Sequence, residues 1–266
     1  MLFSIVILSF ESQRTLEKCL NKAKEAISGF DEPSEIIVVE NGSKDQSRMI
    51  LQEFELQNKT TVLTKSFKLS KNSGTTESRN KALSYSTGEY ILILDSDAYI
   101  TKECLVELKR VLDEKPEVGL ACPKLFYGDG RYQLSTDSFP TLKRKAQRFF
   151  NLDSIQSNIE HKDLKQCEVD YAISACWLLR RDAVDAVNGF DEKIFYSPED
   201  VDYCIQVWKK GFSIEFCPNA EMIHDAQELS RGKKITKFHL HHLLGLFYLF
   251  YKHNYVFNLD RTKIKG

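Results

Sequence analysis

The chain has 266 residues, of which 42% are hydrophobic and 28% are charged, and its formal net charge is −1. This composition is typical of a globular protein and argues against the disordered and fibrous classes. The near-zero net charge and the lack of a long basic run give no general attraction for polyanions, so a nucleic-acid-binding role is disfavoured.

The chain begins with an apolar segment, residues 2–10, that has neither the basic flank nor the small-residue cleavage site of a secretory signal. We therefore expect a first β-strand here and no export. The cysteines agree with this interpretation, because they are odd in number and include no C-x-x-C pair. We interpret them as buried thiols in a reducing compartment, at positions 19, 104, 122, 167, 176, 204 and 217.

The first hundred residues alternate between strand and helix patterns. The strand segments are β-branched runs of the kind that is buried on both faces of a parallel sheet, and the helix segments carry apolar residues at helical spacing. The expected elements are strands at 3–9, 35–39 and 90–94 and helices at 13–28, 45–57 and 74–86. This order predicts an α/β fold with a mostly parallel sheet, in which ligands bind beyond the carboxyl ends of the strands.

Polar residues cluster at or near the ends of these strands. The clusters are Ser9-Phe10-Glu11, residues 40–45 (ENGSKD), Asn72-Ser73-Gly74 leading to Arg79-Asn80, and Asp95-Ser96-Asp97. Each cluster alone could consist of turn and helix-cap residues. Together they favour a binding site at one sheet edge. The two carboxylates of the D-x-D triplet favour a divalent cation there, because Mg²⁺ and Mn²⁺ prefer oxygen ligands.

The second half of the chain is less regular. Residues 120–170 show little periodic pattern, and we expect them to supply acceptor-specific loops, with a tight turn at 128–130 (GDG). Residues 143–150 (KRKAQRFF) form a basic and aromatic patch, either a solvated helix face or a contact for an anionic lipid headgroup or a lipid-linked diphosphate. Further on, a helix begins after Pro198 with residues 199–202 (EDVD), where acids also complement the helix dipole.

The tail from residue 233 mixes aromatic, aliphatic, lysine and histidine residues. Its apolar run is shorter than the roughly 18 residues that indicate a membrane span. Packing on the core, formation of a homodimer and peripheral contact with the inner membrane surface all remain open for residues 233–266.

Together these motifs resemble those of glycosyltransferase family 2, the inverting enzymes of the GT-A fold. The matching segments are the opening strand with Ser9, residues 38–45 (VVENGSKD), 72–74 with Arg79-Asn80, 94–97 (LDSD), 189–192 (GFDE), 195–202 (FYSPEDVD) and His224. Within the family, the pattern is most similar to the rhamnosyltransferase-type branch that builds bacterial surface glycans. The resemblance implies a Rossmann-like, mostly parallel central sheet with flanking helices and a C-terminal helical tail.

The resemblance also implies a domain organisation and a donor site. Residues 1–225 would form the catalytic domain, with a nucleotide-binding half at 1–100 and an acceptor-binding half at 101–225, and residues 226–266 a helical extension. Mn²⁺ or Mg²⁺ would be held by Asp97, Asp95 and His224, although a single histidine is as often a structural group. The nucleotide would be bound by Ser9, Phe10, Glu40, Asn72, Arg79 and Asp95.

For the acceptor, the resemblance implies that Asp200 is the general base and that Glu199 supports it or touches the acceptor. Such a base must lie within hydrogen-bond reach of the hydroxyl that it deprotonates. Trp177 lies where the family lines the acceptor pocket, but core packing is the commoner role of a tryptophan in an apolar run.

The expected function is transfer of a sugar, rhamnose being one candidate, from a UDP- or dTDP-sugar to a glycan or lipid-linked hydroxyl during bacterial surface polysaccharide synthesis. The expected location is the cytoplasm or the inner face of the membrane. Two alternatives are a sugar-1-phosphate nucleotidyltransferase and a non-catalytic protein of the same ancestry that binds a glycan or a nucleotide. The first is disfavoured because residues 9–13 (SFESQ) contain no glycine-rich phosphate loop. The second is disfavoured by the retained acids and histidine, although a fold alone does not establish activity.

Overall fold

The computed structural model describes residues 1–60, 62–142, 144, 164–226 and 237–265. The strands are β1 Phe3–Ser9, β2 Glu35–Glu40, β3 Leu63–Lys68, β4 Tyr90–Asp95, β5 Ala98–Tyr99, β6 Val118–Phe126, β7 Tyr132–Gln133, β8 Thr136–Asp137, β9 Cys167–Glu168, β10 Tyr171–Ala172, β11 Cys176–Arg180 and β12 Ser213–His224. The helices are α1 Leu16–Ile27, α2 Ser47–Gln57, α3 Thr75–Leu83, α4 Lys102–Glu114, α6 Arg181–Val187, α7 Glu199–Lys209, α8 Lys237–His253 and α9 Arg261–Ile264.

The central sheet has the strand order β3-β2-β1-β4-β11-β6-β12-β5. Strands β3, β2, β1 and β4 run parallel to one another, and β11 is antiparallel to both of its neighbours, β4 and β6. The register pairs Ser9 with Glu40 and Leu8 with Asp95, so the first strands reach the same edge of the sheet. The mostly parallel arrangement expected from the sequence is therefore confirmed for the first hundred residues.

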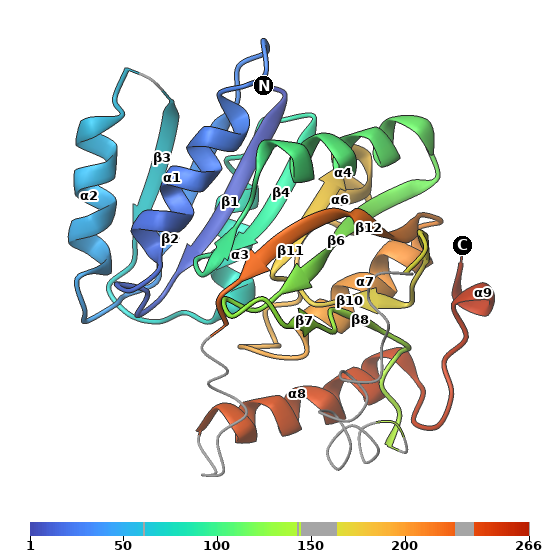
Figure 1. Cartoon of the computed structure of the whole chain (residues 1–266). Coiled ribbons are helices and arrows are strands. Elements are labelled where there is room, and N and C mark those ends of the chain that lie inside the picture. Colours follow the sequence, from blue (N-terminus) through green and yellow to red (C-terminus); the bar gives the residue numbers. More distant parts are fainter. Residues whose placement is uncertain (61, 143, 145–163, 227–236, 266) are drawn as a thin grey trace.

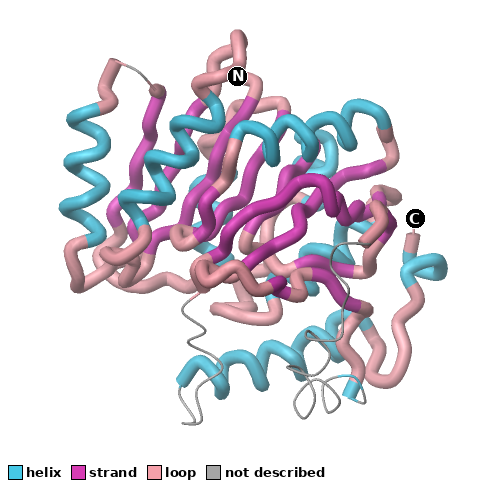
Figure 2. Tube along the Cα trace, viewed as in Figure 1, coloured by secondary structure: helices cyan, strands magenta, loops and turns pink. Residues whose placement is uncertain are grey.

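Helices cover both faces of this sheet (Figures 1 and 2). One hydrophobic core lies under α1, α2 and α4, and the other lies under α3, α6 and α7. Helices are needed on both faces because β1 and β2 carry apolar side chains on each side of the sheet. The carboxyl ends of β1, β2 and β4 remain available for a site.

Several strands were not expected from the sequence, β3 and β6 among them. Strand β3 is a half-exposed edge strand with a mixed polar sequence, so it lacks the apolar run of its neighbours. Strand β6 is buried in the sheet although it contains Gly119 and Pro123. Pro123 lies beside a register shift in the pairing of β6 with β12, and such irregularities tolerate proline. The expectation that residues 120–170 supply loops is therefore wrong for residues 120–126 of β6 and for the short strands β7, β8 and β9, whereas the tight turn at 128–130 is confirmed.

The remaining sequence expectations can be compared with the fold directly. All seven cysteines are free thiols; six are buried as expected, but Cys167 is exposed on β9. Trp177 belongs to the core, where its ring stacks on Tyr203 and Phe190. The basic and aromatic patch at 143–150 lies outside the described residues except for Arg144.

Helix α8 lies along the lower side of the molecule in Figure 1, beneath the region of α7 and β8. It packs Leu246, Leu249 and Phe250 into the core that contains α7, so packing on the core is confirmed for one side of the helix. Its other side exposes apolar side chains, namely Leu243, Leu244, Phe247 and Tyr251. None of the helices in the described part of the chain combines the length and the apolar character needed to cross a bilayer.

Candidate active site

A pocket of about 410 Å³ opens at the carboxyl ends of β1, β2 and β4. The sheet places it there because the first strands end in register and their following loops converge. Eight of the residues proposed from the sequence line this pocket: Phe10, Asn72, Arg79, Asp95, Asp97, Glu199, Asp200 and His224. Residues expected to serve the donor and residues expected to serve the acceptor thus share one cavity.

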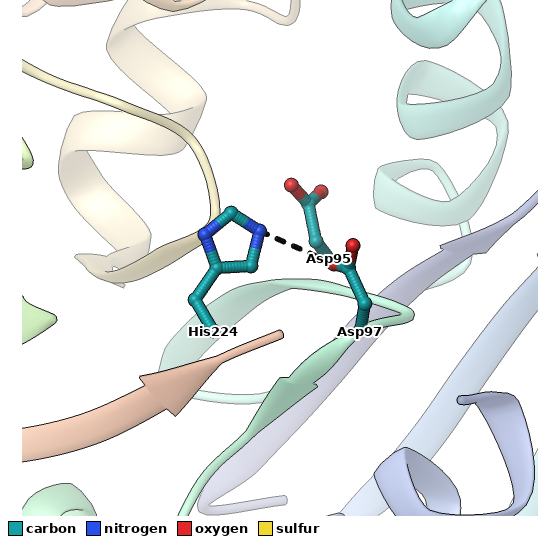
Figure 3. Close-up of side chains that lie close together, drawn as sticks. All are labelled: Asp95, Asp97 and His224. Carbon is teal, nitrogen blue, oxygen red and sulfur yellow. Dashed lines mark ion pairs between the residues drawn. The ribbon is translucent and has the colours of Figure 1, made fainter. Parts of the chain in front are cut away.

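Asp95, Asp97 and His224 form a compact cluster in this pocket (Figure 3). Asp95 ends β4, Asp97 follows it, and the pairing of β12 with β5 sets His224 beside Ala98. One ligand atom from each residue lies within 4.8 Å of the others, and His224 Nε2 is 3.2 Å from Asp97 Oδ1. Two carboxylates and one imidazole suit a divalent cation such as Mn²⁺ or Mg²⁺, so this donor set fits the expected ion.

Gln133 on β7 holds the other nitrogen of the histidine ring. His224 Nδ1 is 3.0 Å from Gln133 Oε1, and both side chains are buried. An amide oxygen accepts hydrogen bonds, so Nδ1 carries a hydrogen; Nε2 then donates to Asp97 Oδ1 when the ring is protonated and offers a lone pair to a cation when the ring is neutral. Burial alone would lower the pKa of His224, but the hydrogen bond and charge of Asp97 raise it above its usual range.

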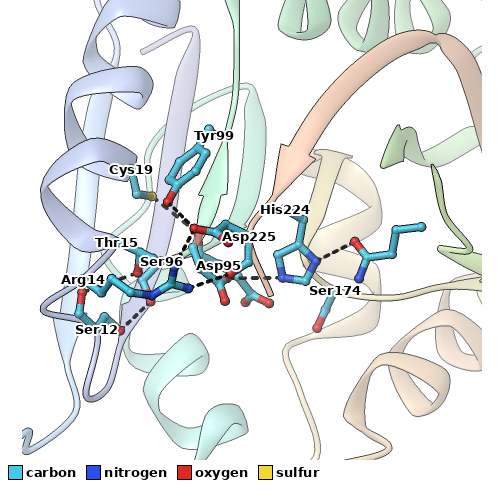
Figure 4. Close-up of polar contacts among 12 residues, drawn as sticks. Ser12, Arg14, Thr15, Cys19, Asp95, Ser96, Tyr99, Ser174, His224 and Asp225 are labelled. Atoms are coloured by element: carbon cyan, nitrogen blue, oxygen red, sulfur yellow. Dashed lines mark hydrogen bonds and ion pairs between the residues drawn. The ribbon is translucent and has the colours of Figure 1, made fainter. Parts of the chain in front are cut away.

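The rim of the pocket is fixed by further polar contacts (Figure 4). Ser12 and Ser96 join their hydroxyl groups at 2.7 Å, which ties the loop after β1 to the D-x-D triplet. Arg14 Nη1 donates to Asp225 Oδ2 at 3.0 Å, beside His224. These bonds connect the loops after β1, β4 and β12, so the cluster is held from three strands.

Arg79 lies beneath the pocket and joins its two sides. The residue is only 3% exposed, and its Nη2 donates to Asp95 Oδ1 at 2.8 Å while its Nη1 lies 3.1 Å from Glu199 Oε1. Ser174, which was not among the site residues predicted from the sequence, accepts from Nη1 at 2.8 Å and donates to Glu199. One guanidinium therefore serves two carboxylates. Burial, reinforced by the charge of Asp200, raises the pKa of Glu199 to about 8.

Glu199 and Asp200 begin α7, the acidic first turn predicted from the sequence. Asp200 lines the pocket, and its Oδ1 accepts a hydrogen bond from the backbone of Val201. Asp202 lies in the same turn but is buried against α8, away from the pocket lining. The three acids of the motif therefore have three different surroundings.

Ser9 and Glu40 lie below the pocket instead of lining it. Both are fully buried, and Glu40 accepts hydrogen bonds from the backbone of Ser43 and from the guanidinium of Arg48. The Glu40 carboxylate thus braces the loop after β2. Asn41, the next residue, does line the pocket, and its side chain is hydrogen-bonded to Asn72, Ser73 and Gly74.

The family model for glycosyl transferase family 2 matches residues 4–187. Poly(ribitol-phosphate) beta-N-acetylglucosaminyltransferase TarS of Staphylococcus aureus is 33% identical over 118 residues, covering 43% of this chain and 19% of that protein. N-acetylglucosaminyl-diphospho-decaprenol L-rhamnosyltransferase of Mycobacterium tuberculosis is 24% identical over 180 residues, covering 65% of this chain and 56% of that protein. This chain thus matches less than two thirds of the length of each relative.

Solved structures of glycosyltransferases share the fold of this chain. TarS residues 1–349 of S. aureus in complex with UDP-GlcNAc superpose with a TM-score of 0.65 at 19% identity, covering 99% of this chain and 69% of that one. The mannosyltransferase PcManGT of Pyrobaculum calidifontis, in complex with GDP-Man and Mn²⁺, gives 0.64 at 16% identity, covering 95% and 64%. The expected GT-A fold is confirmed by these matches. With the family model spanning residues 4–187, this chain belongs to glycosyl transferase family 2.

Proposed function

We propose that this protein is a metal-dependent, inverting glycosyltransferase that acts in bacterial surface polysaccharide synthesis. It transfers a sugar from a nucleoside diphosphate to a hydroxyl group of a glycan or lipid-linked acceptor. The observation that carries the proposal is the shared pocket, where the Asp95, Asp97 and His224 cluster lies together with the carboxylate of Asp200. Such a pocket offers both a place for the leaving diphosphate and a base for the incoming hydroxyl.

The donor side of the pocket is assigned to the nucleotide. Phe10, Asn41 and Asn72 surround the space beyond β1 and β2, where an aromatic ring and amides can hold a base and a ribose. UDP- and dTDP-sugars are the first candidates, with rhamnose one possible sugar, because a structural relative was solved with UDP-GlcNAc and a sequence relative is named a rhamnosyltransferase. We assign this role to residues 1–100 and the acceptor role to residues 101–225.

The three-residue cluster is assigned to Mn²⁺ or Mg²⁺. An ion bound there supplies Lewis-acid neutralisation of the charge that develops on the leaving diphosphate. The protein's own part is to hold Asp95 with Arg79 and to orient His224 with Gln133, so that the donor atoms face one another before any ligand arrives.

Asp200 is assigned as the general base. Its carboxylate takes the proton of the acceptor hydroxyl as that oxygen attacks the sugar on the face opposite to the diphosphate, which inverts the anomeric centre. Glu199, with a pKa of about 8, remains mainly protonated near neutral pH. A neutral Glu199 leaves the charge of Arg79 to Asp95 and can donate a hydrogen bond to the acceptor or to Asp200.

A screen of nucleotides tests the proposed function. Thermal unfolding is measured with each nucleoside diphosphate and its sugars, once with Mn²⁺ and once with a chelator. A ligand at about 100 times its Kd adds roughly 2.7 kcal/mol of stability, so one nucleotide should raise the midpoint, and only with the metal. If no nucleotide shifts the midpoint in either buffer, the non-catalytic alternative replaces this proposal.

For the exposed side of α8 we propose peripheral contact with the inner face of the membrane. Leu243, Phe247 and Tyr251 recur at intervals of four residues and are exposed together on this helix. A membrane surface suits them because the rhamnosyltransferase relative is named for a decaprenol-linked acceptor, and amphipathic helices with aromatic faces bind at such interfaces.

Flotation with anionic vesicles tests this contact. The natural protein should float, and a variant carrying Phe247→Glu and Tyr251→Glu should not. If both proteins behave alike, the membrane assignment is wrong. A dimer detected by sedimentation that dissociates in the same variant would assign the surface to self-association instead.

A further inference from the structure

The segment from Asp191 to Asp200 forms one wall of the pocket. Phe195, Tyr196 and Ser197 line the cavity, and the chain then enters α7, where Glu199 and Asp200 line it too. The position of the proposed base is therefore set by how this wall is held.

The donor side holds the wall from within. The backbone N–H of Thr75 donates to Phe195 O at 2.7 Å, and Thr76 Oγ1 donates to Ile194 O at 2.9 Å. Gly74 allows this close approach, because a Cβ atom at that position would lie 2.4 Å from Phe195 O. The start of α3 thus fixes the middle of the wall.

Helix α8 holds the wall from outside at both of its ends. At the first end, Asp191 accepts hydrogen bonds from Tyr248 at 2.9 Å and from Lys252 at 2.7 Å. At the other end, Ser197 Oγ and His242 Nδ1 lie 2.8 Å apart. Ser197 lies two residues before Glu199, so α8 contacts the chain just before the first turn of α7.

A buried ionic cluster strengthens this attachment. Asp202 is 2% exposed, and its carboxylate meets Lys252 Nζ at 2.9 Å and His253 Nε2 at 2.8 Å. Lys209 Nζ lies 2.9 Å from His253 Nδ1, so Nδ1 accepts from the ammonium group and Nε2 donates to Asp202. Every charge here has a partner on the opposite helix or beside it. With α8 in place, loss of Lys252 and His253 would leave Asp202 buried without these partners, which is strongly unfavourable.

Gly245 brings the backbone of α8 against the wall. A Cβ atom at this position would lie 2.2 Å from Ser197 O and 2.9 Å from Pro198 Cδ. Both distances are too short for real contacts, and one involves a backbone atom that cannot turn aside. Any larger residue at position 245 must therefore displace either α8 or the turn that precedes α7.

From these contacts we infer that α8 positions the acceptor wall and, through it, the carboxylate of Asp200. The positioning residues of α8 are then His242, Gly245, Tyr248, Lys252 and His253. The C-terminal extension thus contributes to the geometry of the proposed acceptor site. The inference rests on the proposed function for the role of Asp200. The placement of the wall by α8 is independent of that role.

The test uses Gly245→Ala in the full chain. Alanine favours the helix more than glycine does, so the only cost is the displacement of the wall. The matched control is Gly29→Ala, where the added methyl group meets only the flexible end of the Lys102 side chain. Hydrogen exchange of residues 191–203, the donor-induced shift in unfolding midpoint with Mn²⁺, and the kcat and KM of transfer are measured on both.

We expect faster exchange of residues 191–203 in Gly245→Ala and a fall in kcat of about 10²-fold, since a misplacement of roughly 1 Å can have that effect. Donor binding should stay within about twofold of the control, because the hydrogen bonds of α8 described above go to residues 191–209 and not to the first hundred residues. His242→Ala, which removes the bond to Ser197 without adding bulk, should show the same pattern more weakly.

Unchanged exchange at 191–203 in both variants would overturn the inference. An equal loss of donor binding and transfer would also overturn it, because α8 would then act on the whole fold. If the natural protein transfers no sugar from any donor, the proposed function fails, and the exchange measurement still decides whether α8 holds the wall.

Discussion

The proposed donor side and the proposed acceptor side of the pocket are built in different ways. The donor side comes mainly from the first hundred residues, where parallel strands end in register and adjacent loops bond to one another. The acceptor side comes from residues 174–202, and its outer support is a helix that begins at residue 237. The donor side thus follows from the sheet itself, whereas the acceptor side depends on contacts between distant segments.

The strongest separation of the two sides should come from Asp200→Asn. Loss of the base should lower the rate of transfer by about 10²- to 10⁴-fold, the usual contribution of general base catalysis. Donor binding should hardly change, since Asp200 belongs to the acceptor wall. Steady-state kinetics and calorimetric titration with the donor measure the two effects. Full turnover by Asp200→Asn would remove the assignment of the base.

Asp97→Ala should instead weaken the binding of the donor. Without this ligand the affinity for the donor in Mn²⁺ buffer should fall by about tenfold or more, toward the value that the natural protein shows with a chelator. In chelator the two proteins should bind the nucleotide alike. Calorimetric titration in both buffers measures this, and an unchanged metal dependence would exclude Asp97 as a ligand.

A smaller effect on the donor side is expected for Gln133→Leu. Loss of the acceptor for His224 Nδ1–H should lower the affinity for Mn²⁺ by about tenfold, the lower end of the range for groups that orient a metal-bound histidine. Gln133→Glu is the control, because its carboxylate still accepts from Nδ1. Titration of Mn²⁺ followed by electron paramagnetic resonance measures both variants. Equal affinities for the leucine and glutamate variants would contradict the assigned tautomer.

The link between the two sides can be tested through pH. In the folded protein the pKa of Glu199 is raised from 4.5 to about 8, mainly by burial. The folded state therefore keeps a proton that the unfolded chain releases, and the free energy of unfolding should decline as the pH rises from about 4.5 to about 8. The slope from this one group approaches about 1.4 kcal/mol per pH unit within that window.

Glu199→Gln mimics the protonated acid and should lack the part of this decline that Glu199 contributes, whereas the part from His224, whose pKa is also raised, remains in both proteins. Urea unfolding of both proteins between pH 5 and 8, with a chelator present, measures the difference. Parallel profiles would mean that Arg79 keeps both of its carboxylate partners charged.

Much of the donor side was predictable because its signals are local. Asp95 and Asp97 follow a buried apolar strand, and the sequence places them at the sheet edge without any knowledge of distant contacts. His224 was also selected, and its pairing with Asp97 follows from the register of β12 with β5. The role of Glu40 in recognising the base stays a prediction, although its carboxylate contacts Arg48 and Ser43.

The residues that were missed have no local signal. Gln133 lies in a two-residue strand within a poorly patterned region, and only the folded sheet brings it to His224. Asp200 and Asp202 look alike in the sequence, because both are acids in one helical turn. What sets Asp202 apart is a helix some fifty residues away, whose Lys252 and His253 contact its carboxylate. Pairing across such distances is decided by tertiary packing, which periodicity does not encode.

The edge strand β3 has one more consequence. An open strand edge offers unpaired backbone groups to any other chain, which makes it a starting point for aggregation. In β3 this edge carries Lys65 and Lys68, and each lysine is neutralised within its own molecule by Glu35 or Glu55. The opposite end of the sheet order is β5, which is only two residues long. One edge strand of the sheet, β3, therefore carries charged side chains, and the other, β5, is very short. Both features hinder the addition of further strands from other molecules when the protein is concentrated.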